Sequence, residues 1–221
     1  MSVFPGVNTT LLINPNYRAI ILTVKNRLVL PIIILAIFIF YTVVYTIQLN
    51  DIAGALLEII PGILGISVLL ASGFTTRELY LRGARLSLKG VLLLFVFFLV
   101  LLPILITGKW VGFNPIHMLV LAPLGGITQE LFFRASLLPL LIRILKSRPF
   151  TAIILHSTLF SIWHMPLVFS EAPLAGAIGV VVVTFFGGLI WGGQVHRDGT
   201  IYWAMGQHIL YLMLMSLFTW G

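Results

Sequence analysis

Apolar stretches about twenty residues long alternate with short polar segments along the whole chain. A helix of about 20 residues crosses a hydrocarbon core of about 30 Å. We expect seven membrane-spanning helices, at 28–47, 52–74, 90–107, 115–145, 150–169, 172–193 and 200–220. The pattern therefore predicts an all-α fold, a polytopic helical bundle in a membrane. Because no repeat or linker divides the chain, we expect one domain over 1–221, with three spans in 28–107 and a core in 115–220.

Composition supports an integral membrane protein. The 221 residues are 60% hydrophobic and 9% charged, whereas about a quarter of the residues in soluble domains are charged. Mean hydropathy is +1.13. The chain has no cysteine, which excludes a disulfide framework and a thiol nucleophile.

The net charge of +7 is distributed as a membrane topology requires, and not as a nucleic-acid-binding surface would be. Basic residues cluster at alternate span ends, which lie on one side of the bilayer, whereas the other side holds only Lys109 with Asp51 and Glu171. Cytoplasmic loops are enriched in Lys and Arg, so we expect a cytoplasmic N-terminus and an external C-terminus. The clustered residues are Arg18, Lys25, Arg27, Arg77, Arg82, Arg85, Lys89, Arg143, Lys146, Arg148 and Arg197.

Three local patterns predict details of the helices. Thr75 and Glu78 have capping-box spacing and open a basic stretch that is either an interfacial helix or a solvated loop. The proline and glycines at 123–126 should kink the fourth span or allow close helix packing, and they could break the helix beside the polar site. The tryptophans fall mostly near span ends, as interfacial anchors do: Trp110, Trp163, Trp191, Trp203 and Trp220.

Five polar residues inside the last four spans form the candidate site. An ionisable side chain at the bilayer centre costs about 2.5 to 3.5 kcal/mol on insertion scales, so such residues usually face a protected interior. Helical rise places Glu130, His164 and His208 at similar depth on three different spans. We therefore predict that they meet in a single buried site, whose members are Gln129, Glu130, Arg134, His164 and His208.

Each of these residues also has a purely structural interpretation. Glu130 and Arg134 are four residues apart and could form an intrahelical ion pair that lets one span carry two charges. His164 or His208 could be a neutral imidazole hydrogen-bonded to a carbonyl. Of the remaining polar residues, we expect Glu58 to be a protonated acid or a partner of a helix end, His156 to line an entrance or be structural, and His117 and His196 to be interfacial.

Three motifs in the last hundred residues carry a family resemblance. QELFFR at 129–134 resembles an EExxxR motif, FSIWH at 160–164 matches FxxxH, and GQHILYL contains His208 in the last span. In order and spacing they resemble the CPBP family, which comprises CAAX proteases and bacteriocin-processing enzymes. The resemblance covers 115–220 and implies a CPBP-like helical core with intramembrane endopeptidase activity.

The resemblance also implies a mechanism. In the family, the first glutamate of the pair and two histidines activate a water molecule that attacks a peptide bond. The later histidine and an asparagine four residues on hold the oxyanion. Here the histidines correspond to His164 and His208, but Gln129 occupies the first glutamate position and Leu212 the asparagine position. A glutamine cannot act as a general base, and a leucine cannot donate a hydrogen bond.

The sequence leaves three interpretations open. Glu130 could take the base role, which needs a distorted helix because adjacent helical residues point about 100° apart. Alternatively, Gln129 marks a lost activity on a retained fold, or the scaffold is a non-catalytic subunit or binding module of a membrane complex. If the chain is active, we expect a cytoplasm-facing site.

The same residues bear on cofactors and partners. Glu130, His164 and His208 would make a His₂Glu set of the kind that binds catalytic zinc, although no HExxH motif supports it. The expected partners are the lipid bilayer and either a membrane-associated peptide substrate or other membrane subunits. Nucleic acid is not an expected partner.

Overall fold

The structure is a bundle of long helices. This computed structural model describes residues 15–47, 52–83, 92, 109–146, 148–171 and 174–219. The α-helices are α1 (Pro15–Thr46), α2 (Ile52–Ala71), α4 (Ala122–Gln129), α5 (Leu138–Leu145), α6 (Pro149–Glu171), α7 (Leu174–Asp198) and α8 (Tyr202–Met215). Two segments are π-helical, η1 (His117–Leu121) and η2 (Glu130–Leu137). Together with α4 and α5 they form one continuous helical run from His117 to Leu145, called the central run below.

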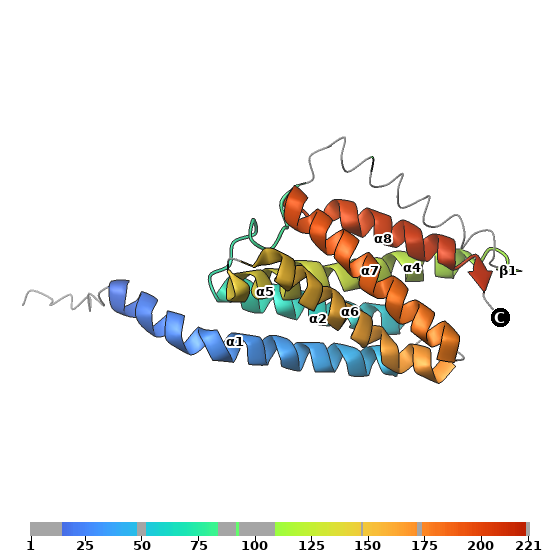
Figure 1. Ribbon diagram of the computed structural model, residues 1–221. Helices are drawn as coiled ribbons and strands as arrows, with labels where there is room; N and C mark the ends of the chain where they lie inside the picture. Colours follow the sequence, from blue (N-terminus) through green and yellow to red (C-terminus); the bar gives the residue numbers. More distant parts are fainter. Residues whose placement is uncertain are drawn as a thin grey trace, which may run out of the picture.

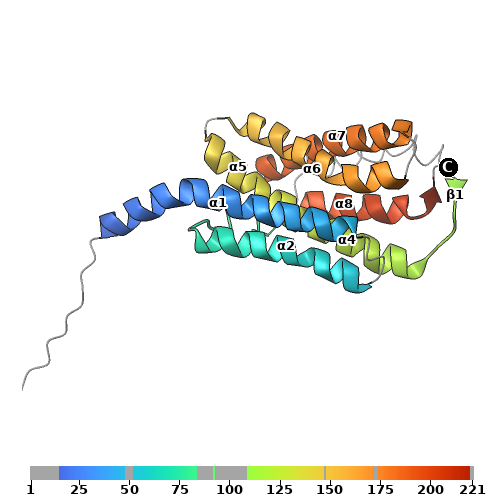
Figure 2. The ribbon, with the colours of Figure 1, turned by 90° about the horizontal axis from the view of Figure 1, so that it is seen from below.

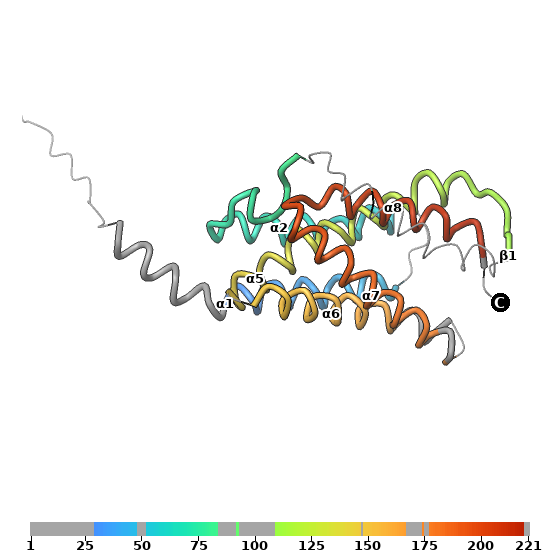
Figure 3. The backbone as a smooth tube through the Cα atoms, turned by 45° about the horizontal axis from the view of Figure 1, so that its top comes forward, coloured from blue at the N-terminus to red at the C-terminus, as the bar shows by residue number. Residues whose placement is uncertain are grey.

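The run from η1 to α5 passes through the middle of the bundle. Figure 1 shows α1 along one edge of the bundle, and in Figure 2 α2 lies along one edge and α6 and α7 lie along the other. The run contacts α2 along α4 and η2, α8 along α4, and α6 along α5 and η2. Figure 3 shows α8 alongside this run in another orientation.

Helices of membrane-spanning length are present. Val29–Thr46, Ile52–Ala71 and Ala177–Asp198 are each long and apolar enough to cross a bilayer. Large apolar side chains on α1, α2 and α7 point outward, as lipid-facing side chains do. The predicted span at 90–107 lies outside the described residues apart from Leu92. The protein is thus an integral membrane protein of helical build, and the count of seven spans stays a prediction.

The all-α prediction omitted a small pair of strands. β1 (Lys109–Trp110) pairs with β2 (Phe218–Thr219) in antiparallel fashion, with Trp110 opposite Phe218. The ladder is continued by the hydrogen bond from the Val111 amide to the Leu217 carbonyl, at 3.0 Å. As a result, α8 ends at Met215, short of the predicted boundary at residue 220.

The expected break at 123–126 is absent, and a different distortion takes its place. The chain stays α-helical there and becomes π-helical in η1 and η2. Pro123 and Pro139 are each the second residue of the α-helix that follows a π-helical segment. A proline ring clashes with the carbonyl four residues earlier, and a widened turn relieves that clash. The two prolines therefore account for the position of both π-helical segments, and η2 begins at Glu130.

Glycines set the register between the central run and its neighbours. A Cβ on Gly62 would lie 2.7 Å from the Leu131 Cβ, and a Cβ on Gly65 would lie 2.7 Å from the Ser136 Oγ. The helix α2 therefore runs parallel to η2 in close contact. On the other side, a Cβ on Gly126 would lie 2.8 Å from the Ile209 Cγ1. These contacts fix the depth of α2 and α8 relative to Glu130.

The ends that carry the basic clusters come together, as their positions along the chain predict. Arg143 contacts the Glu78 carboxylate at 2.6 Å, and the Tyr80 hydroxyl lies 3.1 Å from the Nδ1 of His196. Thr200 donates a hydrogen bond to the Arg82 carbonyl at 2.9 Å. The ends of α2, α5 and α7 therefore form one basic face of the bundle.

The capping-box contacts between Thr75 and Glu78 form, but the described residues directly after them, up to residue 83, are not helical. Thr75 and Glu78 exchange hydrogen bonds in both directions, and the segment 76–80 is a turn that ends at Tyr80 with φ +57°. Partial burial tends to raise the pKa of Glu78, but hydrogen bonds from Thr75 and Arg143 outweigh it and lower that pKa below its usual value. The rest of the basic stretch, 84–89, lies outside the described residues.

We predict that Gly126→Ala destabilises the bundle. Its Cβ would also lie 3.2 Å from the Ile209 backbone, which cannot move aside as a side-chain tip can. Such overpacking costs about 1 to 3 kcal/mol, which corresponds to a fall of roughly 3 to 10 °C in the thermal midpoint in detergent. The control is Gly206→Ala on α8, where no described atom lies within 4 Å of the added Cβ. Equal midpoints for the two variants would contradict the packing argument.

Candidate active site

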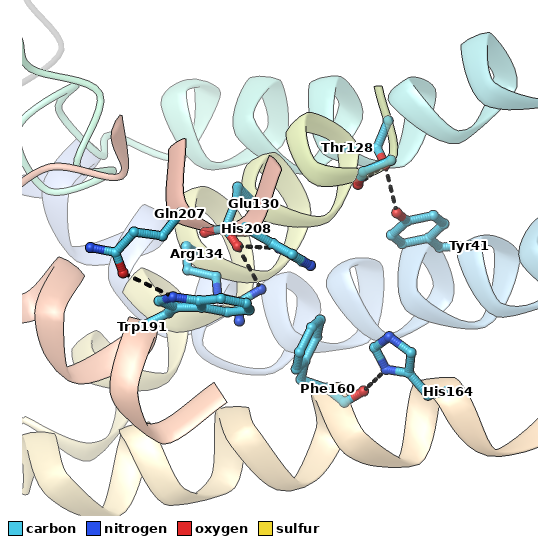
Figure 4. A network of polar contacts seen from close by, with 10 residues as sticks. Tyr41, Thr128, Glu130, Arg134, Phe160, His164, Trp191, Gln207 and His208 are labelled. Carbon is cyan, nitrogen blue, oxygen red and sulfur yellow. Dashed lines mark hydrogen bonds and ion pairs between the residues drawn. The ribbon is translucent and has the colours of Figure 1, made fainter. Parts of the chain in front are cut away.

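A charged network in the centre of the bundle joins the central run to α8. The Glu130 Oε1 lies 2.8 Å from the Nδ1 of His208 and 3.1 Å from the Nη1 of Arg134. Figure 4 shows both contacts meeting at the same carboxylate oxygen. Glu130 and Arg134 are fully buried, and His208 is 3% exposed. The predicted ion pair is therefore present, and a histidine from a second helix completes it.

Aromatic faces surround the Arg134 guanidinium. Its central carbon lies 4.2 Å from the centre of the Phe160 ring and 5.6 Å from that of Trp191. The guanidinium meets Glu130 at ion-pair distance, but it makes no linear hydrogen bond within the described part of the chain. Cation–π contacts with desolvated rings therefore supply part of its stabilisation.

The Glu130 carboxylate fixes the orientation of His208. A carboxylate only accepts hydrogen bonds, so the Nδ1 of His208 donates and the Nε2 of the neutral ring is left as an acceptor. Trp191 stacks on the imidazole at 4.4 Å and donates to the Gln207 Oε1 at 3.1 Å. In Figure 4 the His208 ring points away from Glu130, toward the side on which Tyr41 and His164 lie.

His164 is oriented in a similar way but by a different acceptor. Its Nδ1 donates to the Phe160 carbonyl at 2.8 Å, one turn earlier on α6, so the Nε2 of the neutral ring is again an acceptor. The Phe160 ring lies edge-on to both imidazoles, with centroid distances of 4.7 Å to His164 and 6.1 Å to His208. Both imidazoles are thus nearly perpendicular to one phenyl ring, and Glu130 bonds only that of His208.

A cavity of about 340 Å³ lies beside this network. Gln129 and Leu212, the two positions that depart from the CPBP pattern, both line it. Its wall also includes Glu58 of α2, Tyr45 of α1, and His117 and Ser216 near the strand pair. The cavity therefore lies at the end of the bundle opposite the basic face.

Gln129 and Glu130 occupy different environments although they are neighbours. Gln129 lines the cavity and is 6% exposed, whereas Glu130 is fully buried in the ion-pair network. The distortion that the first hypothesis required does begin at Glu130, but the carboxylate is held by Arg134 and His208. Glu130 is therefore placed to orient His208.

Some site residues could not be identified from the sequence. Trp163 and Trp191 are buried in the core and not at the membrane interface, and Trp191 stacks on His208. Glu58 was expected to be a protonated acid or a partner of a helix end, and it is part of the cavity wall. The only sign of Glu58 in the sequence was its position as an ionisable residue inside an apolar span. His156 is buried against Phe160 and does not line the cavity.

The suggested zinc ligands are not assembled as a metal site. Within the described ranges, no group of three or more His, Cys, Asp or Glu side chains could hold a metal ion. Glu130 is engaged with Arg134 and His208, and His164 bonds a backbone carbonyl. The donor set that zinc requires is therefore incomplete among these residues.

The geometry agrees with a family comparison. Residues 110–214 match the sequence profile of the Rce1-like family, described as type II CAAX prenyl endopeptidase. Over these residues the chain resembles the Rce1-like family. The resemblance to CAAX proteases is thus confirmed for the segment that holds the network and most of the cavity wall. No curated protein and no solved structure matches the chain.

The Rce1-like match narrows the class of function. The description of the family suggests a CAAX-type intramembrane protease. The matched segment begins at β1 and ends within α8, so Glu58 lies outside it.

We predict that Arg134→Met is strongly destabilising because it leaves the Glu130 carboxylate buried and unpaired. Removing one partner of a buried pair costs about 3 to 5 kcal/mol. The double variant with Glu130→Gln should lose much less than the sum of the two single losses in unfolding measurements in mixed micelles. Arg143→Met is the control, since its ion pair with Glu78 is 40–45% exposed and worth about 0 to 1 kcal/mol. Additive single losses would show that the buried pair is not coupled.

Proposed function

We propose that the protein is an intramembrane endopeptidase of the CAAX type. The observation that carries the proposal is the hydrogen bond from His208 to the buried Glu130, inside the Rce1-like segment and next to the cavity. A carboxylate that orients an imidazole is a common arrangement in sites that move protons. We further propose that 115–220 forms the reactive core and that a membrane-associated peptide enters the cavity.

In this proposal the two imidazoles hold the hydrolytic water. Each has its Nδ1 engaged as a donor, so each keeps a lone pair on its Nε2. One of these lone pairs accepts one water hydrogen, and the other water hydrogen is left for a base. Arg134 neutralises Glu130 and keeps the network charge-balanced, while Trp191 and Phe160 keep bulk water away. A dry environment strengthens hydrogen bonds to the charge that develops on the peptide carbonyl oxygen.

Loss of an imidazole should abolish cleavage without unfolding the protein. We expect His208→Ala and His164→Ala to lower the cleavage rate roughly 100-fold or more, the usual contribution of a positioned proton-transfer group. The assay uses the full chain in proteoliposomes with lipid-anchored peptides, and mass spectrometry detects the products. His196→Ala is the control, because His196 contacts Tyr80 on the basic face, away from the cavity. Cleavage at the wild-type rate by His208→Ala would contradict the proposal.

A second candidate function is peptide binding without cleavage. It is favoured by one observation, namely that the cavity wall carries an amide at Gln129 and an alkyl chain at Leu212. Stable capture of lipid-anchored peptides with no product from the wild-type chain or from Gln129→Glu would support a binding module or complex subunit. A gain of cleavage in Gln129→Glu alone would indicate a disabled protease.

We also propose that the cavity faces the side opposite the cytoplasm. Cytoplasmic loops are enriched in Lys and Arg, so we assign the basic face to the cytoplasmic side. The cavity lies at the other end of the bundle. A cytoplasm-facing site and a cytoplasmic N-terminus were both expected from the sequence, and the two expectations conflict when substrate enters through this cavity. The charge rule favours the cytoplasmic N-terminus.

Single cysteines can test this orientation, because the chain has none of its own. We expect Val111→Cys, near the cavity, to react with a membrane-impermeant maleimide on intact cells. Thr76→Cys, on the basic face, should react only after the membrane is permeabilised. Both positions are exposed, so a difference between them reports the side of the membrane. The reverse labelling pattern would place the N-terminus and the basic face outside.

A further inference from the structure

Glu58 is the carboxylate that lines the cavity. The other carboxylates whose side chains the structure describes are paired: Glu130 with Arg134, Glu78 with Arg143, and Asp198 with Arg197. Glu58 makes no hydrogen bond or ion pair within the described ranges, and it is half-buried in the cavity wall. It lies inside a membrane span, where an ionisable side chain carries a free-energy cost and usually has a task.

The glycine contacts place Glu58 at the depth of the central polar residues. Glu58 is four residues before Gly62 and so shares its face of α2, one turn away. Gly62 packs directly on Leu131, and α2 runs parallel to the central run. Glu58 therefore faces α4 about one turn before Leu131, close to Gln129. On the opposite side of α4, Gly126 packs on Ile209, the neighbour of His208.

The surroundings of Glu58 give it a defined position. Tyr41 of α1 is fully buried and donates its hydroxyl to the Thr128 Oγ1 at 3.1 Å. Glu58 lies within electrostatic range of that tyrosine. Tyr41 also packs against Trp163 at 4.7 Å, which ties this wall to the helix that carries His164. Helices α1, α2 and α4 thus form the part of the cavity wall that contains Glu58 and Gln129.

The cavity wall carries a carboxylate and an amide, as the CPBP pattern does, but at different positions of the chain. The CPBP pattern has a carboxylate at the position of Gln129 and an amide at the position of Leu212. Here the amide is on Gln129 and the carboxylate is on Glu58, and both line the cavity. One carboxylate and one amide therefore line the same space, and α8, which contributes Leu212 to its wall, also carries His208.

We propose that Glu58 is the general base of this protein and that Gln129 is its oxyanion donor, an inference that rests on the proposed endopeptidase function. A water proton passes to the Glu58 carboxylate as the water oxygen bonds to the peptide carbonyl carbon. The Gln129 amide donates a hydrogen bond to the resulting oxyanion. When the C–N bond breaks, the proton on Glu58 passes to the leaving nitrogen, so that an acid and an amine are released and the carboxylate is regenerated.

The decisive experiment moves the carboxylate between the two positions. Cleavage of lipid-anchored peptides is compared for the wild-type chain, Glu58→Gln, Gln129→Glu and the double variant Glu58→Gln with Gln129→Glu. We expect Glu58→Gln to lower kcat roughly 100-fold or more with little change in KM. The double variant should recover at least part of that loss, because it restores a carboxylate to the same cavity.

Two controls separate catalysis from folding. Glu78→Gln makes the same chemical change on the basic face, away from the cavity, and should leave kcat unchanged. Thermal midpoints in detergent should agree between Glu58→Gln and the wild type, because Glu58 has no ion-pair partner to lose in the described part of the chain. The acidic limb of the kcat profile against pH should disappear in Glu58→Gln.

The outcomes distinguish this inference from the function on which it rests. Cleavage by folded Glu58→Gln within about threefold of the wild type would overturn the role of Glu58 and leave the endopeptidase function standing. A folded wild-type chain that yields no product would overturn both. Loss of cleavage in Glu58→Gln, with recovery in the double variant, would support the base role, since a purely structural defect would not be rescued by a carboxylate at 129.

Discussion

The Glu130 carboxylate lies in a part of the bundle that water does not reach, and its need for partners organises the polar core. Arg134 supplies the countercharge from the next turn, and His208 supplies a hydrogen bond from α8. Each contact constrains a second feature, because Arg134 must lie between Phe160 and Trp191, and His208 must present its far nitrogen away from the carboxylate. A buried carboxylate with one partner on its own helix and one on α8 favours a packing of the helices that keeps both contacts.

Backbone features make that arrangement possible. The widened turn that relieves the clash at Pro139 covers the residues from Glu130 to Leu137, so the charged pair lies in the distorted segment. Gly62, Gly65 and Gly126 then let α2 and α8 approach this segment closely. Phe160 has a defined role in the same structure, since its ring contacts both imidazoles and the guanidinium. The phenylalanine of the FxxxH motif is thus required by packing around the histidines.

The cavity accounts for the two departures from the CPBP pattern together. Gln129 and Leu212 line the same space as Glu58, so the loss of a carboxylate on one helix coincides with a carboxylate on another. Glu58 comes from a helix outside the Rce1-like segment. A site whose reactive groups are divided between the matched segment and an earlier helix can keep its chemistry while its motif changes, because a reaction depends on where the groups lie in space.

The sequence by itself determined the helical class, the membrane environment, the clustering of basic ends and the Glu130–Arg134 pair. These follow from hydropathy and from spacing along one helix, which are local properties. The proximity of Glu130 and His208 was also predictable from depth. Tertiary structure alone decided that Glu130 orients His208, that Trp191 is buried beside it, that β1 pairs with β2, and that Glu58 shares a cavity with Gln129. Those relations depend on how helices rotate and approach one another, which close glycine contacts set and which hydropathy along the chain does not encode.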